Sequence, residues 1–190
     1  MRHRIFIAIN LPENIKNKLI TYQDNWPDLP IRWTKKENLH ITLVFLGSVA
    51  DDGIPEMLKV VEQVTQKHNP FFIDLNQICY GPPKKMPPRM VWATGKSSKE
   101  LSQLYGDLQH SLLDSYLKDS IKTEKRSYSL HITLGRIRSW DFKRINPEER
   151  PIIKENINFN FTANSIEVME SYLKRGGAQY AILKSFPLIV

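Results

Sequence analysis

The tetrapeptide His-Ile-Thr-Leu occurs twice in the 190-residue chain, at residues 40–43 and at residues 131–134. With five histidines and eight threonines, composition alone would place a threonine two residues after a histidine only ~0.2 times. Imidazole changes its protonation state near neutral pH, and a hydroxyl group can donate a hydrogen bond to an anionic oxygen. The repeated pattern therefore predicts a functional site that contains two copies of this pair.

Two such pairs are suited to the cleavage of a phosphodiester. A neutral imidazole can take a proton from the nucleophile, and a protonated imidazole can give a proton to the leaving oxygen. Two threonine hydroxyls can donate hydrogen bonds to the non-bridging phosphate oxygens, where negative charge collects. We therefore predict His40 and His131 as an acid–base pair, with Thr42 and Thr133 binding the phosphate.

A β-strand is the element that would position each pair. Residues i and i+2 of a strand point to the same face, so His40 and Thr42 would share one face while Ile41 and Leu43 anchor the other. The same argument holds for the second copy. One His-x-Thr pair would more simply be explained as a core histidine beside a β-favouring threonine, but the duplication favours the functional interpretation.

The surrounding sequence repeats the order strand, helix, strand, and each repeat is followed by a strand-rich tail. The expected strands are 5–9, 39–46 (ended by Gly47), 71–80, 90–94, 130–137, an extended segment 158–173, and 179–188, which pairs back as a hairpin. Three helices are expected: one begins at Pro12, and the other two cover 54–64 and 101–112. This pattern predicts an α+β chain with two pseudo-twofold-related lobes, each with an antiparallel sheet and helices, and an active-site cleft between them. Residues 1–190 would form this single bilobal domain.

Charge and cysteine content limit the partners and the compartment. The net charge of +7 favours a polyanionic partner such as nucleic acid or a phosphorylated ligand, although many basic proteins bind no nucleic acid. The single cysteine, Cys79, cannot form an intrachain disulfide, which fits a reducing compartment. The apolar run 5–9 is too short for a signal sequence or a membrane span. We expect a cytoplasmic monomer that does not bind a membrane.

A metal site is the competing chemical interpretation. It would need three or four ligands, and Glu37 is the one nearby candidate, three residues before His40. We therefore expect neither a metal nor another cofactor.

Three residues beyond the tetrapeptides have open interpretations. Strict alternation points Arg136 away from His131, unless Gly135 bulges the strand, so phosphate contact and a surface role both remain. Phe45 is expected to pack in the core with Ile41 and Leu43, with base stacking as its alternative, which also applies to Trp33.

The two motifs resemble those of the two-histidine (2H) phosphoesterase superfamily, which is defined by paired His-x-Thr-x motifs. The flanking residues are most similar to the RNA 2′,3′-cyclic phosphodiesterases, also called 2′-5′ RNA ligases. The similar segments are Arg4–Ile9, Arg32-Trp33, Glu37–Leu39, Phe45–Gly47, Val91-Trp92, Leu130–Arg136 and Gly177–Tyr180.

This resemblance implies a substrate and separate histidine roles. The substrate would be an RNA end with a 2′,3′-cyclic phosphate, hydrolysed to a 2′-phosphate, with reversible 2′-5′ joining of tRNA halves. His40 would be the proton donor and His131 the proton acceptor, and arginine is usual at the position of Arg136. A phosphoesterase that acts on a small cyclic phosphate and a non-catalytic RNA-binding module are the alternatives.

Overall fold

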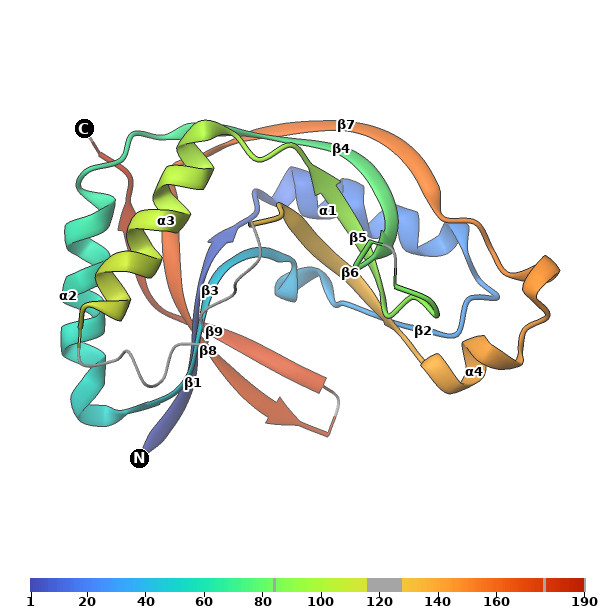
Figure 1. Cartoon of the computed structure of the whole chain (residues 1–190), viewed down its shortest axis with the longest axis horizontal. Helices are drawn as coiled ribbons and strands as arrows, with labels where there is room; N and C mark the ends of the chain where they lie inside the picture. The colour runs from blue at the N-terminus through green and yellow to red at the C-terminus, as the bar shows by residue number, and fades with distance from the viewer. Residues whose placement is uncertain (84, 116–127, 176, 190) are drawn as a thin grey trace.

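Nine antiparallel strands form one sheet in a computed structural model that describes residues 1–83, 85–115, 128–175 and 177–189 (Figure 1). The strand order is β7-β4-β5-β6-β3-β1-β8-β9, with β2 beside β6. The strands are β1 (Arg2–Asn10), β2 (Ile31–Trp33), β3 (His40–Ala50), β4 (Phe71–Gly81), β5 (Met90–Gly95), β6 (His131–Ile137), β7 (Lys154–Ala163), β8 (Ser165–Lys174) and β9 (Gly177–Pro187). The helices are α1 (Glu13–Thr21), α2 (Ile54–Thr65), α3 (Lys99–Leu113) and α4 (Ser139–Arg144).

The sheet divides into two lobes where β3 meets β6. These central strands are joined by a single residue pair, Ile41 with Ile132. We call β3, β1, β8 and β9 the first lobe, and β6, β5, β4, β7 and β2 the second lobe. The predicted bilobal α+β fold is confirmed, with the addition that the two sheets are continuous through this one pair.

The helices exchange lobes. Helix α3 follows β5 of the second lobe, yet it packs beside α2 and against β3 of the first lobe (Figure 1). Helix α1 follows β1 of the first lobe, but Lys18 of α1 and Tyr22 directly after it contact the ring of Phe159 on β7. Each of these two helices therefore packs on the lobe opposite to the strand that it follows, whereas α2 packs on β8 and β9 of the first lobe.

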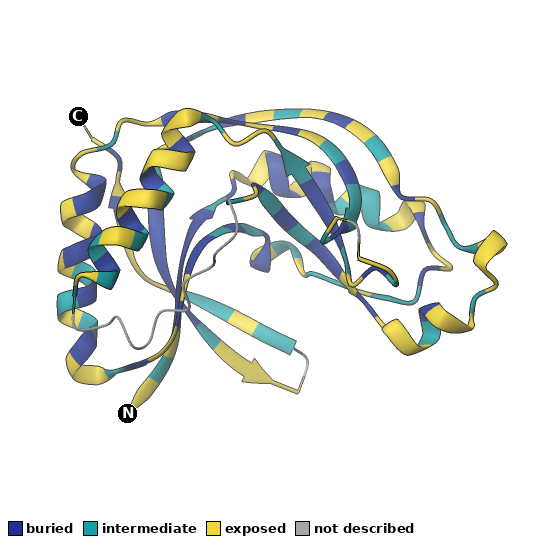
Figure 2. Cartoon of the chain, viewed as in Figure 1, coloured by how far each residue is buried: buried dark blue, intermediate teal, exposed yellow. Residues whose placement is uncertain are grey.

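Residues 5–9 of strand β1 are buried on both faces of the strand, and this part is dark blue in Figure 2. Ile5, Ile7 and Ile9 belong to the main core. Phe6 and Ala8, on the opposite face, form a small second cluster with Met169, and Tyr180 packs against it. Phe6 and Tyr180 of this second cluster give the first lobe an apolar surface that faces the second lobe.

The structure differs from the sequence prediction at several element boundaries. Strand β3 does not end at Gly47 but continues to Ala50, because Gly47 adopts φ 71° at a bulge opposite β1. The extended segment 158–173 is two strands, β7 and β8, separated at Asn164. The short elements β2 and α4 were not predicted.

None of the described helices combines the length and the apolar character that a membrane span requires.

Candidate active site

Both His-x-Thr pairs line one cavity of about 430 Å³ between the lobes. His40 and Thr42 enter it from β3, and His131 and Thr133 enter it from β6. On the opposite face Ile41 and Ile132 are fully buried. The alternation that the sequence predicted is therefore present, and the structure brings the two motifs together.

The two imidazoles are held in the same way. The Nδ1 atom of His40 donates to the carbonyl of Asn38 at 2.8 Å, and the Nδ1 atom of His131 donates to the carbonyl of Ser129 at 2.8 Å. Because a carbonyl can only accept, each Nδ1 must carry a hydrogen. Nε2 is then the atom through which each ring can exchange a proton with a substrate.

His40 lies in surroundings that disfavour its charged form. Its ring is 5.0 Å from the ring of Phe6 and 5.2 Å from that of Tyr180, between centroids. Burial lowers the pKa of His40 to about 4, and the hydrogen bond that its Nδ1 donates to the Asn38 carbonyl offsets only part of this effect. His40 is thus neutral at pH 7, and its Nε2 accepts a hydrogen bond from Thr42 Oγ1 at 2.9 Å.

His131 has a different neighbour, the indole ring of Trp92 on β5. The two rings are stacked, with centroids 4.0 Å apart and planes at 26°. The face of an indole attracts a cation. Gly81 packs under the indole, since a Cβ atom there would lie 2.2 Å from the Trp92 ring. The two histidines therefore have different aromatic neighbours.

Phe45 does not pack in the core, contrary to our prediction. Its side chain is 65% exposed and lines the cavity. The cause is a register shift between β1 and β3, where Ile7 pairs with Val44 and Ala8 pairs with Thr42. The extra residue reverses the alternation after the motif and turns Phe45 to the cleft.

A matching bulge turns Arg136 into the same cavity. Val91 pairs with Gly135 and Trp92 pairs with Thr133, which leaves Leu134 without a partner across the β5–β6 ladder. Arg136 then lines the cavity beside Thr133. The sequence allowed a bulge near Gly135 to turn the Arg136 side chain, and the structure has such a bulge. This orientation favours a role for Arg136 in the cleft over a purely surface role.

The described residues that line the cavity include two arginines, Arg4 and Arg136, and no aspartate or glutamate. A smaller adjoining hollow of about 180 Å³ shares Arg136 and adds Arg32 and Lys35. Within the described ranges, no three His, Cys, Asp or Glu side chains are grouped so that they could hold a metal ion. The charges of the cleft favour an anionic ligand.

The sequence reasoning missed several cleft residues, namely Arg4, Phe6, Trp92 and Tyr180. Trp92 could have been found by pairing the expected strands 90–94 and 130–137, because cross-strand neighbours share a face. Trp33 was considered for base stacking. Its ring centroid is 6.4 Å from that of Trp26, and Trp33 lines the adjoining hollow and not the main cavity.

A family model described as LigT like Phosphoesterase matches residues 9–92 and 96–180, so the chain belongs to the LigT-like phosphoesterase family. The predicted two-histidine superfamily and the predicted enzyme class are thereby confirmed.

Relatives and solved structures match between 72% and 99% of the chain. An RNA 2′,3′-cyclic phosphodiesterase of Methanocaldococcus jannaschii is 29% identical over 184 residues, which are 96% of this chain and 99% of the relative. One of Bacillus subtilis is 29% identical over 138 residues, 72% of each chain. A crystal structure of Thermus thermophilus TT0787 matches with a TM-score of 0.84 at 23% identity, covering 97% of each chain. Escherichia coli LigT complexed with 3′-AMP matches with a TM-score of 0.74 at 24% identity, covering 99% of each chain. At this identity the two structures share the fold with this chain.

Proposed function

We propose that this protein hydrolyses the 2′,3′-cyclic phosphate at an RNA end to a 2′-phosphate. The observation that carries the proposal is the convergence of two imidazoles and two threonine hydroxyls on one cavity without a carboxylate in its described lining. The relatives named RNA 2′,3′-cyclic phosphodiesterases support the substrate. The net charge of +7 fits a polyanion.

In the proposed reaction His131 acts as the base and His40 as the acid. Nε2 of His131 takes a proton from water as the water oxygen attacks phosphorus. Stacking on Trp92 stabilises the imidazolium that forms. The bond from phosphorus to the 3′ oxygen breaks, and Nε2 of His40 gives its proton to that oxygen. The products are a 2′-phosphate and a 3′-hydroxyl.

The low pKa of His40 is compatible with the donor role. An anionic phosphate in the cleft favours the protonated form that burial disfavours. Protonated His40 can then give its proton from Nε2 to the leaving oxygen. Its Nε2 then no longer accepts from Thr42, whose hydroxyl is free to turn to a phosphate oxygen together with that of Thr133.

Arg136 would neutralise charge on the same substrate, because its guanidinium enters the cavity beside Thr133. With a 5′-hydroxyl in place of water as the nucleophile, the same steps would form a 2′-5′ bond between tRNA halves and leave a 3′-hydroxyl. None of these steps uses a metal, so the activity is expected to persist in EDTA.

One panel assay tests the proposal. Purified protein is incubated with 2′,3′-cyclic mononucleotides, oligoribonucleotides that end in a cyclic phosphate, and tRNA halves, and the products are resolved as 2′ or 3′ phosphates. We expect 2′-phosphates, and a loss of kcat of about 10²–10⁴-fold in His40→Ala and in His131→Ala. Full activity in both variants would refute the acid–base assignment.

The same panel separates the alternatives. Turnover of mononucleotides alone would indicate a small cyclic phosphate as the substrate, for which the cavity volume is sufficient. Salt-sensitive RNA binding without any turnover would indicate a binding module.

A further inference from the structure

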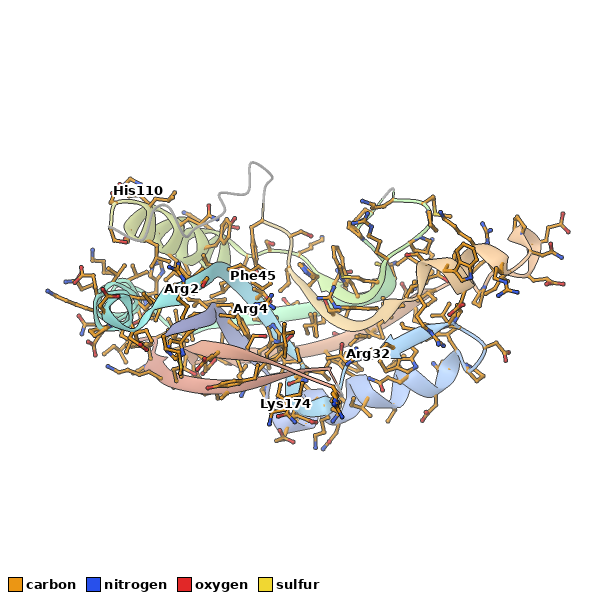
Figure 3. All side chains as sticks on the ribbon, turned by 90° about the horizontal axis from the view of Figure 1, so that it is seen from below. Arg2, Arg4, Arg32, Phe45, His110 and Lys174 are labelled. Atoms are coloured by element: carbon orange, nitrogen blue, oxygen red, sulfur yellow. The ribbon has the colours of Figure 1, made fainter. Side chains whose placement is uncertain are left out.

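The cleft continues along β1 beyond the two histidines. Ala8 pairs with Thr42, next to the proposed phosphate site, and Phe6 pairs with Phe45. Arg4 is the next residue on the same face of β1, four positions before Ala8 and so about 13 Å further along the strand. Figure 3 shows Arg4 and Phe45 close together, and both line the cavity.

The guanidinium of Arg4 is available to bind a ligand. Its side chain is exposed, and no hydrogen bond or ion pair joins it to any of the described residues. No acidic side chain is among the described residues that line the cavity with it. A phosphate held between Thr42 and Thr133 is too far from Arg4 to contact it directly, whereas a second phosphate on the same chain can reach it.

Phe45 lies between the histidines and Arg4 along this path. Its ring is 6.1 Å from that of Phe6, yet 65% of its side chain remains exposed to solvent. Leu173 of β8, which is 73% exposed, lines the same end of the cavity. An exposed aromatic ring next to a free cation is the arrangement by which proteins bind single-stranded nucleic acid, stacking on a base and holding the backbone.

We propose that Phe45 and Arg4 form a second nucleotide subsite, which rests on the function proposed above. Phe45 stacks on the base that neighbours the terminal nucleotide, and Arg4 binds an internucleotide phosphate of the same strand. The subsite makes the enzyme prefer an oligoribonucleotide to a cyclic mononucleotide. The subsite thus adds a preference for the length of the RNA strand to the proposed substrate.

The test compares adenosine 2′,3′-cyclic phosphate with oligoadenylates of two to four nucleotides that end in the same group. We expect kcat/KM to rise by about tenfold or more with the first added nucleotides and then to level off. Arg4→Gln and Phe45→Ala should each lower the ratio of oligonucleotide to mononucleotide kcat/KM by about fivefold or more. Phe45→Tyr keeps an aromatic face and should keep the ratio.

Arg2→Gln is the matched control. Arg2 lies on the same strand and carries the same charge, but it is hydrogen-bonded to Ser48 and does not line the cavity. We expect this variant to retain the wild-type ratio. A fall as large as that in Arg4→Gln would attribute the effect to overall charge and would overturn the subsite.

The other outcomes separate the two proposals. A wild-type ratio near one, or equal losses on both substrates in Arg4→Gln, would overturn the subsite and leave the proposed function intact. If no cyclic phosphate is hydrolysed, the proposed function fails. The subsite is then judged by anisotropy with a labelled triadenylate 3′-phosphate at several KCl concentrations. Loss of one phosphate contact in Arg4→Gln should make the slope of log K against log salt shallower by about 0.7. An unchanged slope would overturn the subsite.

Discussion

The indole of Trp92 lies stacked on the imidazole of His131, with 4.0 Å between ring centroids. The contact comes from the pairing of β5 with β6, which places Trp92 opposite Thr133. His40 instead meets the ring of Tyr180 edge-on at 89° and the ring of Phe6 at a tilt of 38°. The two histidines have matching backbone contacts, so their aromatic neighbours are one difference between them.

Moving the indole should therefore impair the base without altering any proposed catalytic group. Gly81→Ala places a Cβ where the Trp92 ring now lies, so the ring must shift. We expect kcat to fall by about 3–30-fold, the equivalent of a cation–π contact of up to about 2 kcal/mol. Steady-state kinetics would measure this change, and the melting temperature would report how far the fold suffers. Gly106→Ala is the control, because a Cβ there meets nothing within 4 Å; equal kinetic losses in both variants would contradict the role of the stack.

Protonation of His40 should accompany anion binding. The pKa of His40 is about 4 in the empty cleft, below its ordinary 6.5, and a bound anion favours the protonated ring. Lowering the pH towards 4 should therefore tighten sulfate binding, by up to about tenfold per pH unit. Isothermal titration calorimetry in buffers of different ionisation enthalpy would measure both the affinity and the proton uptake. His40→Gln should bind sulfate with a weaker pH dependence, and an identical dependence would contradict the prediction.

The same low pKa has a consequence for stability. Between pH 6.5 and about 4 the unfolded chain binds a proton at His40 and the folded chain does not. This group therefore lowers the free energy of unfolding as the pH falls through that window. Urea unfolding of the wild type and of His40→Gln across the window would check it, with the variant losing less stability on acidification.

The two threonine hydroxyls should matter through their hydrogen bonds and not through their shape. Thr42→Val and Thr133→Val keep the volume and remove the donor, so we expect each to lower kcat by about 10–10³-fold. Thr42→Ser and Thr133→Ser should keep most of the activity. Thr162→Val, on β7 and outside the cavity lining, is the matched control. Wild-type kcat in Thr42→Val and Thr133→Val would exclude the proposed contacts with phosphate.

The junction between the lobes should couple stability to activity. Ile41 and Ile132 are fully buried and form the single residue pair that joins β3 to β6. Ile41→Ala and Ile132→Ala should each cost about 2–5 kcal/mol of unfolding free energy, and the double variant should be non-additive because the two residues are paired. Ile166→Ala, on β8 and equally buried, provides a comparison at similar stability. We expect a larger loss of kcat at the junction than at Ile166, because each junction isoleucine directly follows a histidine of the site.

The sequence predicted those parts of the site that follow from simple strand alternation. His40, Thr42, His131 and Thr133 share the cleft because residues i and i+2 share a face. The orientation of Phe45 could not be predicted, since it depends on a bulge whose position is set by the pairing of β3 with β1. The contact of Trp92 with His131 is likewise a cross-strand effect. Strand β2 has only three residues, directly after the loop that contains Pro27 and Pro30, which is too few for a periodic pattern.

The exchange of helices between the lobes also bears on the origin of the two-motif chain. The first half of the chain would hold one His-x-Thr pair and α2, but it would lack α3, which packs beside α2 and against β3, and it would lack β8 and β9, which extend the sheet beside β1. Such a fragment would expose core surface unless a second copy supplied the missing elements. An ancestral single-motif chain with this topology could then have completed both its core and its pair of histidines only as an intertwined homodimer, which fusion into one chain would have made permanent.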